Sequence, residues 1–180
     1  SGTGDIASFT ATNTGTAPVD ATIVVTPHFE NGSVTCDGPT KTFTITVNPT
    51  AEVNQPASEV VCNGGTATAV TFGTPNTGGT VTYTWTNDDT SIGLAAIGTG
   101  DIASFTPTNT GTAPVVATIV VTPHFENGSV TCDGPTKTFT ITVNPTAEVN
   151  QPASEVVCNG GTTTAVTFGT PNTGGTVTYT

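Results

Sequence analysis

The stretch KTFTITVNPTAEVNQPASEVVCNGGT occupies residues 41–66, and the same 26 residues return at positions 137–162. The offset is 96 residues (137 − 41), and with this offset residues 1–84 match residues 97–180 at all but four positions. A period of this length is closer to a small domain than to a solenoid unit of about 20–50 residues. The sequence therefore predicts tandem copies of one domain. The four differing pairs are Ser1/Ile97, Ala11/Pro107, Asp20/Val116 and Ala67/Thr163.

Apolar residues alternate with threonines in the quoted stretch, where Phe43, Ile45 and Val47 are separated by single threonines. Residues 80–86, TVTYTWT, repeat this period-two pattern, which is typical of a strand buried on one face. We expect further strands at residues 5–11, 21–29, 59–62 and 68–72. We expect the core aromatic side chains to be Trp85, Tyr83, Phe43 and Phe72.

Turn residues rich in glycine, asparagine and proline separate these strands about every ten residues. Threonine fills 45 of the 180 positions, which suits pleated strands better than helices. A chain rich in threonine, glycine and proline could also be disordered, but the regular alternation favours a folded chain. The sequence predicts an all-β protein of tandem immunoglobulin-like Greek-key β-sandwiches with a 96-residue repeat.

The pair Asn48-Pro49 marks the predicted boundary between copies, because proline lacks the N–H that a strand ladder needs and restricts the preceding residue. Residues 1–48 are then the C-terminal half of one sandwich, residues 49–144 a complete one and residues 145–180 the N-terminal half of the next. A cut in the Gly-rich segment 91–100 is the alternative. We expect the chain to be part of a longer protein, with stiff joins between its domains.

The composition argues against several classes of function. Only 2 basic residues oppose 13 acidic ones, giving a net charge of −11, which disfavours binding to nucleic acid or to an anionic membrane surface. No apolar run reaches the roughly 18–20 residues of a membrane span. No nucleophile–base pattern, paired carboxylates or phosphate-binding loop is recognisable, so we do not expect an enzyme.

Four phrases of the repeat carry a family resemblance, namely VCNGGT (61–66), GTVTYTWTNDDTSIGLAA (79–96), TNTGTAPV (108–115) and GPTKTFTITVNPT (38–50). They resemble the PKD-like, immunoglobulin-type tandem repeats of giant cell-surface proteins of Bacteroidetes, and the resemblance covers the whole chain. The chain departs from the PKD domain proper, because WTNDDTS stands where that domain has a Gly-Asp-Gly turn after its tryptophan.

The resemblance implies an extracellular, cell-surface protein and a structural role as stalk or filament of a large bacterial adhesin. Such adhesins include those of gliding bacteria, which the type IX secretion route exports. The expected partners are neighbouring repeats of the same chain, with a surface or glycan ligand at a distal region. A multivalent glycan- or ice-binding module is the alternative function, since rows of outward threonines are expected. A designed consensus array would also fit the near-identity of the copies.

Each copy has two cysteines and no CxxC motif, a pattern that favours disulfides in a surface protein. With the boundary at Asn48-Pro49, Cys62 and Cys132 lie in the same copy, and we expect them to pair. One objection is that Cys62 is near the first hairpin turn and Cys132 near the last, and in a simple sandwich these two turns lie at opposite ends. Links of Cys36 to Cys62 and of Cys132 to Cys158, between successive copies, remain the alternative.

No cofactor is expected, and calcium is the one metal left open. A neighbouring pair such as His28 and Glu30 offers too few ligands for zinc, so a surface histidine is the better interpretation. Acidic residues in the turns could supply oxygen ligands to calcium, but their spacing matches no known calcium loop. These residues are Asp88, Asp89, Asp101 and Glu59.

Overall fold

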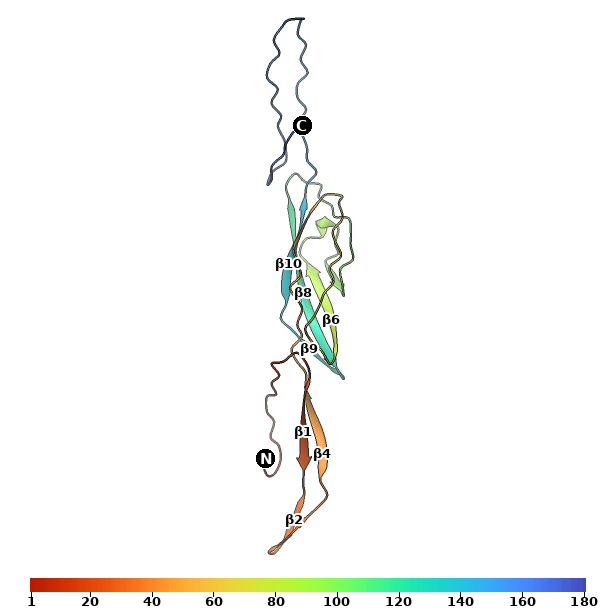
Figure 1. Ribbon diagram of the computed structural model, residues 1–180, viewed down its shortest axis with the longest axis vertical. Coiled ribbons are helices and arrows are strands. Elements are labelled where there is room, and N and C mark those ends of the chain that lie inside the picture. Colours follow the sequence, from red (N-terminus) through yellow and green to blue (C-terminus); the bar gives the residue numbers. More distant parts are fainter. The chain divides into compact units, whose positions relative to one another are not determined.

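The computed structural model describes residues 1–180 and consists of β-strands and loops, with no α-helix (Figure 1). The coarse prediction of an all-β protein is confirmed. The chain forms two compact units. Unit 1 comprises Ser1–Asn54, Gly73–Thr82 and Thr122–Thr136, and unit 2 comprises Gln55–Phe72, Tyr83–Val121 and Lys137–Thr180.

Ten strands and one 3-10 turn, η1, make up the regular structure. Most strands are short, and β8 is the longest, with 13 residues. The elements are β1 (Val19–Val25), β2 (His28–Asn31), β3 (Val34–Asp37), β4 (Lys41–Val47), β5 (Glu59–Cys62), β6 (Thr80–Asn87), η1 (Thr90–Ile92), β7 (Ile97–Thr99), β8 (Val115–Asn127), β9 (Val130–Asp133) and β10 (Lys137–Asn144).

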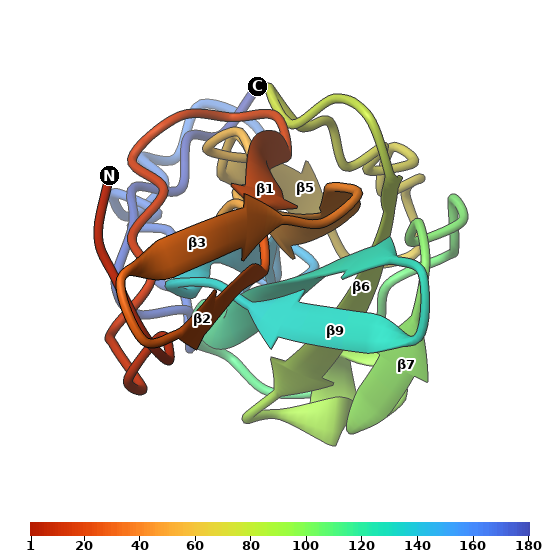
Figure 2. The same cartoon turned by 90° about the horizontal axis from the view of Figure 1, so that it is seen from below.

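Unit 1 contains three antiparallel strand pairs. β1 pairs with β4 in the register Val19↔Val47, and β2 pairs with β3 as a hairpin, whose neighbouring arrows are visible in Figure 2. The end of β8 pairs with β9 in a second hairpin, in the register Phe125↔Cys132. The β2–β3 and β8–β9 hairpins have the same sequence and the same register, 96 residues apart.

Unit 2 is centred on a mixed sheet with the strand order β5-β10-β8-β6-β7, in which β6 and β8 also extend into unit 1. The ribbon shows β10, β8 and β6 as neighbours (Figure 1). β5 runs parallel to β10, whereas β10 is antiparallel to β8 and β6 is antiparallel to β7.

The alternation predicted for residues 80–86 is confirmed in β6. Its threonines are exposed, while Tyr83 and Trp85 are buried. The Trp85 ring lies directly against β7, because a Cβ added at Gly98 would be 2.1 Å from Cζ2 of Trp85. A glycine is therefore required opposite the tryptophan.

Every buried apolar side chain lies between Pro49 and Val143. Most of these side chains belong to unit 2, including the inward residues of β10, and those of unit 1 are Pro49, Ala51, Val53, Pro123 and Phe125. Residues 1–48 and 145–180 are largely exposed. The predicted copy boundaries and the sandwich arrangement stay predictions.

Two predicted strands do not form. The predicted strand at residues 68–72 forms only the isolated bridge Val70↔Ile102, and the nearby Ala67 forms the bridge Ala67↔Phe105. Ile102 and Phe105 lie in residues 101–107, the counterpart of the predicted strand at residues 5–11. The predicted strand 21–29 is interrupted between β1 and β2, although the same sequence is continuous in β8. In β8, Pro123 and Phe125 are fully buried, so their packing supports a continuous strand here.

Candidate functional site: the junction between repeat copies

The first junction consists of residues 13–18, 46–54 and 73–79, all in unit 1. Its connector begins at Asn48-Pro49, where β4 has ended, and it has no regular secondary structure. Pro49 and Ala51 are nevertheless fully buried, and Val53 is only 4% exposed. The connector is therefore a packed segment.

Asn76 is the centre of this junction. It lies in the turn TPNTGG, is only 8% exposed, and is fixed locally by hydrogen bonds with the Thr74 hydroxyl. Its Oδ1 accepts from the Glu52 N–H at 2.6 Å, and its side-chain NH₂ donates to the carbonyl oxygens of Thr50 at 3.0 Å and Thr16 at 3.3 Å. One amide thus joins the connector to the loop at residues 13–18.

The loop that contains Thr16 is itself held by an asparagine. Asn13 donates to the carbonyl oxygens of Ala17 and Val47 and accepts from the Gly15 N–H. The Thr16 carbonyl also accepts from the Thr77 N–H at 2.9 Å. These bonds satisfy backbone groups that would otherwise lose their hydrogen bonds to water on packing.

Glycine at 78 allows the turn to approach this loop closely. A Cβ added there would be 2.8 Å from Cδ of Pro18, and Gly78 has a φ of +75°, a conformation that other residues rarely adopt. The close approach therefore depends on a residue without a side chain.

The second junction consists of residues 109–114, 142–150 and 169–175, all in unit 2, and repeats this geometry. Asn172 accepts from the Glu148 N–H at 2.6 Å and donates to the carbonyl oxygens of Thr146 at 2.9 Å and Thr112 at 3.4 Å. The Thr173 N–H donates to the same Thr112 oxygen at 2.9 Å. The two junctions therefore share one hydrogen-bond pattern, 96 residues apart.

Two further asparagines strengthen the second junction. The Asn63 side chain accepts from the Asn109 N–H at 2.8 Å and donates to the Thr146 hydroxyl at 3.0 Å. Asn109, only 5% exposed, donates to the carbonyl oxygen of Val143 at 2.7 Å. Asn109 is the counterpart of Asn13, so its loop is held in the same way in both copies.

In the first junction, a reciprocal asparagine pair adds a further link. The Asn127 side chain donates to Oδ1 of Asn48 at 2.9 Å, and the Asn48 side chain donates to the Asn127 carbonyl at 3.3 Å. The backbone of Gly134 also packs closely against the connector, since a Cβ there would be 1.7 Å from the Ala51 carbonyl oxygen. The β8–β9 hairpin therefore packs against the connector.

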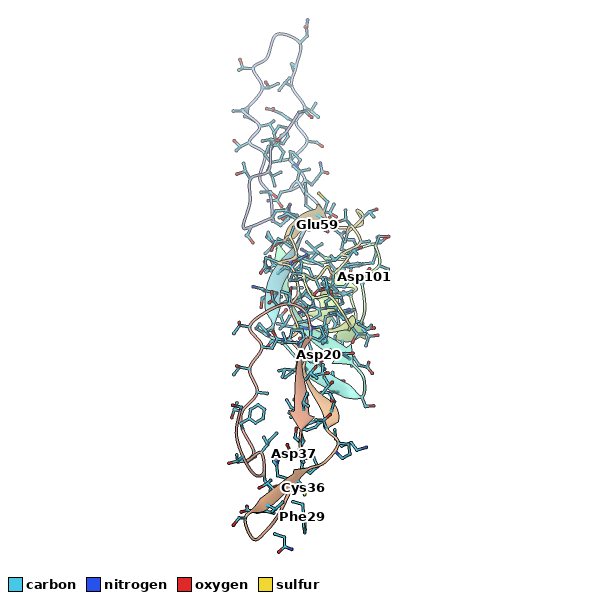
Figure 3. All side chains as sticks on the ribbon, turned by 60° about the horizontal axis from the view of Figure 1, so that its bottom comes forward. Asp20, Phe29, Cys36, Asp37, Glu59 and Asp101 are labelled. Atoms are coloured by element: carbon cyan, nitrogen blue, oxygen red, sulfur yellow. The ribbon has the colours of Figure 1, made fainter.

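The acidic residues considered for calcium instead accept hydrogen bonds from backbone groups, and no three ligand-type side chains gather at one point. Asp88 accepts from the Thr118 N–H at 2.6 Å and Asp101 from the Phe72 N–H at 2.9 Å (Figure 3 labels Asp101 and Glu59). Glu59 accepts from the Thr68 N–H at 3.1 Å. Their carboxylates thus link separate segments of the backbone.

Asp89 caps the 3-10 turn η1. The Ser91 hydroxyl and the Ser91 N–H both donate to its carboxylate, and these bonds lower the pKa of Asp89. The site is solvent-exposed, so the interaction acts locally at the turn.

The disulfide expected between Cys62 and Cys132 does not form, which corrects the prediction from sequence. All four cysteines, including Cys36 and Cys158, are free thiols. Cys62 is opposite Asn144 at the end of β10, and Cys132 is opposite Phe125 near the end of β8. Neither cysteine therefore has another cysteine as its partner in a strand ladder.

The two histidines are paired with aspartates rather than with the glutamate considered from sequence. Nδ1 of His28 is 2.6 Å from Oδ1 of Asp37, and His124 and Asp133 repeat this distance. Both pairs join the two strands of a hairpin, and Figure 3 labels Asp37 on the first of them. The surface position expected for His28 is the one observed, since it is exposed.

Three of the four expected core aromatics are buried, namely Trp85, Tyr83 and Phe72. Phe43 differs, with 45% exposure, whereas its counterpart Phe139 is 3% exposed and packs 6.4 Å from the Phe72 ring. The four outward threonines of β6 are exposed as expected.

Sequence reasoning missed the junction asparagines. Asn13 and Asn76 lie in segments rich in glycine, proline and asparagine that are typical of turns, and a turn asparagine is ordinarily explained by local backbone bonding. The available signal was their identical recurrence at Asn172 and Asn109. Repetition alone, however, does not distinguish a junction residue from any other residue of the copy.

Comparison with protein-family models, with curated proteins and with solved structures finds no match to this chain. None of its helical segments has the length and apolar character needed to cross a membrane.

Proposed function

We propose that this chain is a structural segment of a large extracellular bacterial surface adhesin, built from tandem immunoglobulin-like, PKD-like β-sandwich repeats. It forms part of a stalk or adhesive filament. The observation that carries this proposal is the junction itself, because Asn76 and Asn172 make the same set of bonds at successive copies.

A junction of this kind suits a protein that becomes longer when its 96-residue repeat is duplicated. Each copy presents the TPNTGG turn at one side and the loop TNTGTAP at the other, so the contact joins unlike surfaces head to tail. Such a contact can be repeated without limit. In repeat proteins the stability gained at each junction adds to that of the copies.

The location at the cell surface is supported by the sequence. The PKD-like phrases belong to surface proteins, and an acidic chain with outward threonines remains soluble without sticking to neighbours. Export by the type IX route and a part in gliding motility follow from the same resemblance. The role is non-enzymatic, with neighbouring repeats as the main partners and any ligand at a distal region.

The proposal is tested on cells of the organism that makes the protein. An antibody raised against residues 49–144 is expected to label intact, unpermeabilised cells, and labelling only after permeabilisation would overturn the surface location. An array of three copies viewed by electron microscopy is expected to show evenly spaced particles at a fixed angle. Freely jointed particles would overturn the structural role of the junction.

A further inference from the structure

The chain contains the dipeptide Asn-Gly at two places in residues 49–144, Asn63-Gly64 and Asn127-Gly128, and each recurs 96 residues away, at Asn159-Gly160 and Asn31-Gly32. An asparagine followed by glycine loses its side-chain amide nitrogen most readily, because glycine has no Cβ to hinder attack by its own backbone nitrogen. Since the dipeptide is the same at Asn63 and Asn127, the surroundings of each decide how fast it reacts.

The reaction consumes one water and releases one ammonia. The backbone nitrogen of the glycine loses its proton and attacks Cγ of the asparagine, and the side-chain nitrogen leaves as ammonia. Water then opens the resulting succinimide ring at one carbonyl to give aspartate, or at the other to give isoaspartate. Either product carries a carboxylate in place of the amide, and in isoaspartate the backbone also becomes one CH₂ group longer.

At Asn63 both reacting groups are held by hydrogen bonds. The Gly64 N–H, whose nitrogen would have to attack, donates to the Pro107 carbonyl oxygen at 2.9 Å. The Asn63 side-chain amide accepts from the Asn109 N–H at 2.8 Å and donates to the Thr146 hydroxyl at 3.0 Å. All three bonds must break before the two groups can meet, so the reaction is suppressed here.

At Asn127 the attacking group is not held. Gly128 is one of the two turn residues of the β8–β9 hairpin, whose β9 arrow is visible in Figure 2. It is exposed, and its N–H donates to no backbone or side-chain acceptor. Nothing lies within 4 Å of a Cβ added at Gly128, so no neighbouring atom hinders a change of the turn. One hydrogen bond holds the Asn127 side-chain amide, which donates to Oδ1 of Asn48 at 2.9 Å.

We propose that Asn127-Gly128 is a site of spontaneous deamidation, at which Asn127 is converted to aspartate or isoaspartate in the folded chain while Asn63 remains an asparagine. The driving difference is the hydrogen bonding of the two glycine N–H groups and of the two amides. The proposal does not depend on the function proposed above.

The conversion acts on the contact between the β8–β9 hairpin and the connector. A carboxylate cannot donate, so the bond from Asn127 to Oδ1 of Asn48 is lost and two acceptor oxygens face each other. In isoaspartate, the longer backbone also displaces the Asn127 carbonyl oxygen, which accepts from the Asn48 amide at 3.3 Å. The converted chain is therefore expected to have a weaker first junction.

Peptide mass spectrometry of the full chain, incubated in mildly alkaline buffer at physiological temperature, tests the proposal. Residues 31–41 and 127–137 have the same sequence, so the two sites must be separated before the second digestion. Trypsin cleaves after Lys41 and Lys137 and isolates residues 42–137. A protease specific for glutamate then cleaves after Glu126 and separates Asn127 from Asn63.

Asn127 is expected to convert at least about tenfold faster than Asn63 in the folded chain, because less structure must open at the hairpin turn. In urea that unfolds the chain, the two rates should become similar. A rate at Asn127 equal to or below that at Asn63 in the folded chain would overturn the proposal, and so would a difference that persists in urea.

Two variants locate the chemistry. Asn127→Gln keeps a side-chain amide but is expected to abolish the conversion, since its longer side chain would have to close a larger ring, which forms far more slowly. Asn48→Ala is expected to accelerate the conversion of Asn127, because it removes the acceptor that holds the amide. Unchanged conversion in Asn127→Gln would contradict the assigned site. Thermal unfolding of each variant checks that its fold is retained.

The effect on the junction is measured on the converted chain itself. In a background carrying Asn31→Gln and Asn159→Gln, only Asn63 and Asn127 can react by this route. The added negative charge separates converted from unconverted chains by anion exchange, and the converted chains are expected to unfold at a lower urea concentration. Asn127→Asp, which adds the charge without lengthening the backbone, should lie between the two. Equal midpoints before and after conversion would exclude the effect on the junction.

Discussion

At the scale of single residues, the junction depends on side-chain amides. An asparagine both donates and accepts, so Asn76 satisfies a backbone N–H and two backbone carbonyls at one point. An aspartate there would lack the two donated bonds, and a threonine would be too short to provide all three. This chemistry allows a connector without regular structure to be buried.

Replacing Asn76 with alanine should therefore destabilise the chain. The change removes the partners of the Glu52 N–H and the Thr50 carbonyl, whose bonds to Asn76 are partly buried, and this costs about 1–3 kcal/mol in the free energy of unfolding. Urea denaturation measures this loss. The matched control is Asn172→Ala, at the more exposed second junction, where water can replace the lost bonds and the expected cost is below about 1 kcal/mol. Equal losses at both positions would contradict the role assigned to burial.

Gly98 provides a second test at this scale. An alanine there would place its methyl group within the Trp85 ring, so we expect a loss of about 2–3 kcal/mol in the free energy of unfolding. Gly2 is its counterpart 96 residues earlier and has nothing within 4 Å of the added Cβ. Gly2→Ala should be neutral. Chemical denaturation of both variants distinguishes the clash with tryptophan from any general effect of losing glycine.

The turn η1 gives a pH dependence of known sign. The bonds from Ser91 lower the pKa of Asp89, so they stabilise the folded state above the ordinary pKa of an aspartate. This contribution is lost as the pH falls through the lowered pKa. NMR titration of the Asp89 carboxyl group should give a midpoint below that of an ordinary aspartate. In Ser91→Ala the midpoint should move upwards, and an unchanged midpoint would exclude the hydroxyl as its main cause.

At the scale of elements, identical sequences adopt different structures in different surroundings. Residues 59–62 form β5 because β10 lies beside them, whereas residues 155–158, with the same sequence EVVC, form no strand. Val156 is accordingly 97% exposed. A four-residue strand is too short to persist without a partner, so its formation depends on tertiary contacts.

Hydrogen exchange should report this difference directly. The most protected amide of β5 is expected to exchange at least about tenfold more slowly than the most protected amide of residues 155–158. The comparison is internally controlled, because the local sequences and their intrinsic exchange rates are the same. Similar exchange in the two segments would mean that β5 gains no protection from its pairing with β10.

At the scale of the whole molecule, burial is concentrated in one stretch of the chain. Every buried apolar side chain lies between residues 49 and 143, whereas residues 1–48 and 145–180 keep large apolar side chains exposed. The complete copy at residues 49–144 stays a prediction.

Limited proteolysis tests this distribution. A protease that cleaves after aromatic residues should cut first after Phe9, Phe29 and Phe168, which are exposed. Phe72, Tyr83, Phe125 and Phe139 should be resistant because they are buried. Early cleavage at any of these four would contradict the predicted complete copy.

The sequence by itself determined the strands whose alternation continues over seven or more residues. β4, β6 and β10 appear where the threonine alternation predicted them, because a period of two gives a strand one apolar face. That face is buried in β6 and β10 but not in β4. The repeat, visible in the sequence, also determined that the two junctions would be alike.

Only the tertiary structure decided which copy of an ambiguous segment becomes regular and which residues meet across the junction. The continuity of β8, the pairing of β5 and the convergence of Asn76 on Thr16 and Thr50 all depend on neighbours distant in sequence. The strand partners of Cys62 and Cys132, Asn144 and Phe125, are likewise set by tertiary pairing, and both thiols are free. Local pattern specifies which face of a strand is apolar, but contacts between distant segments specify what that face meets.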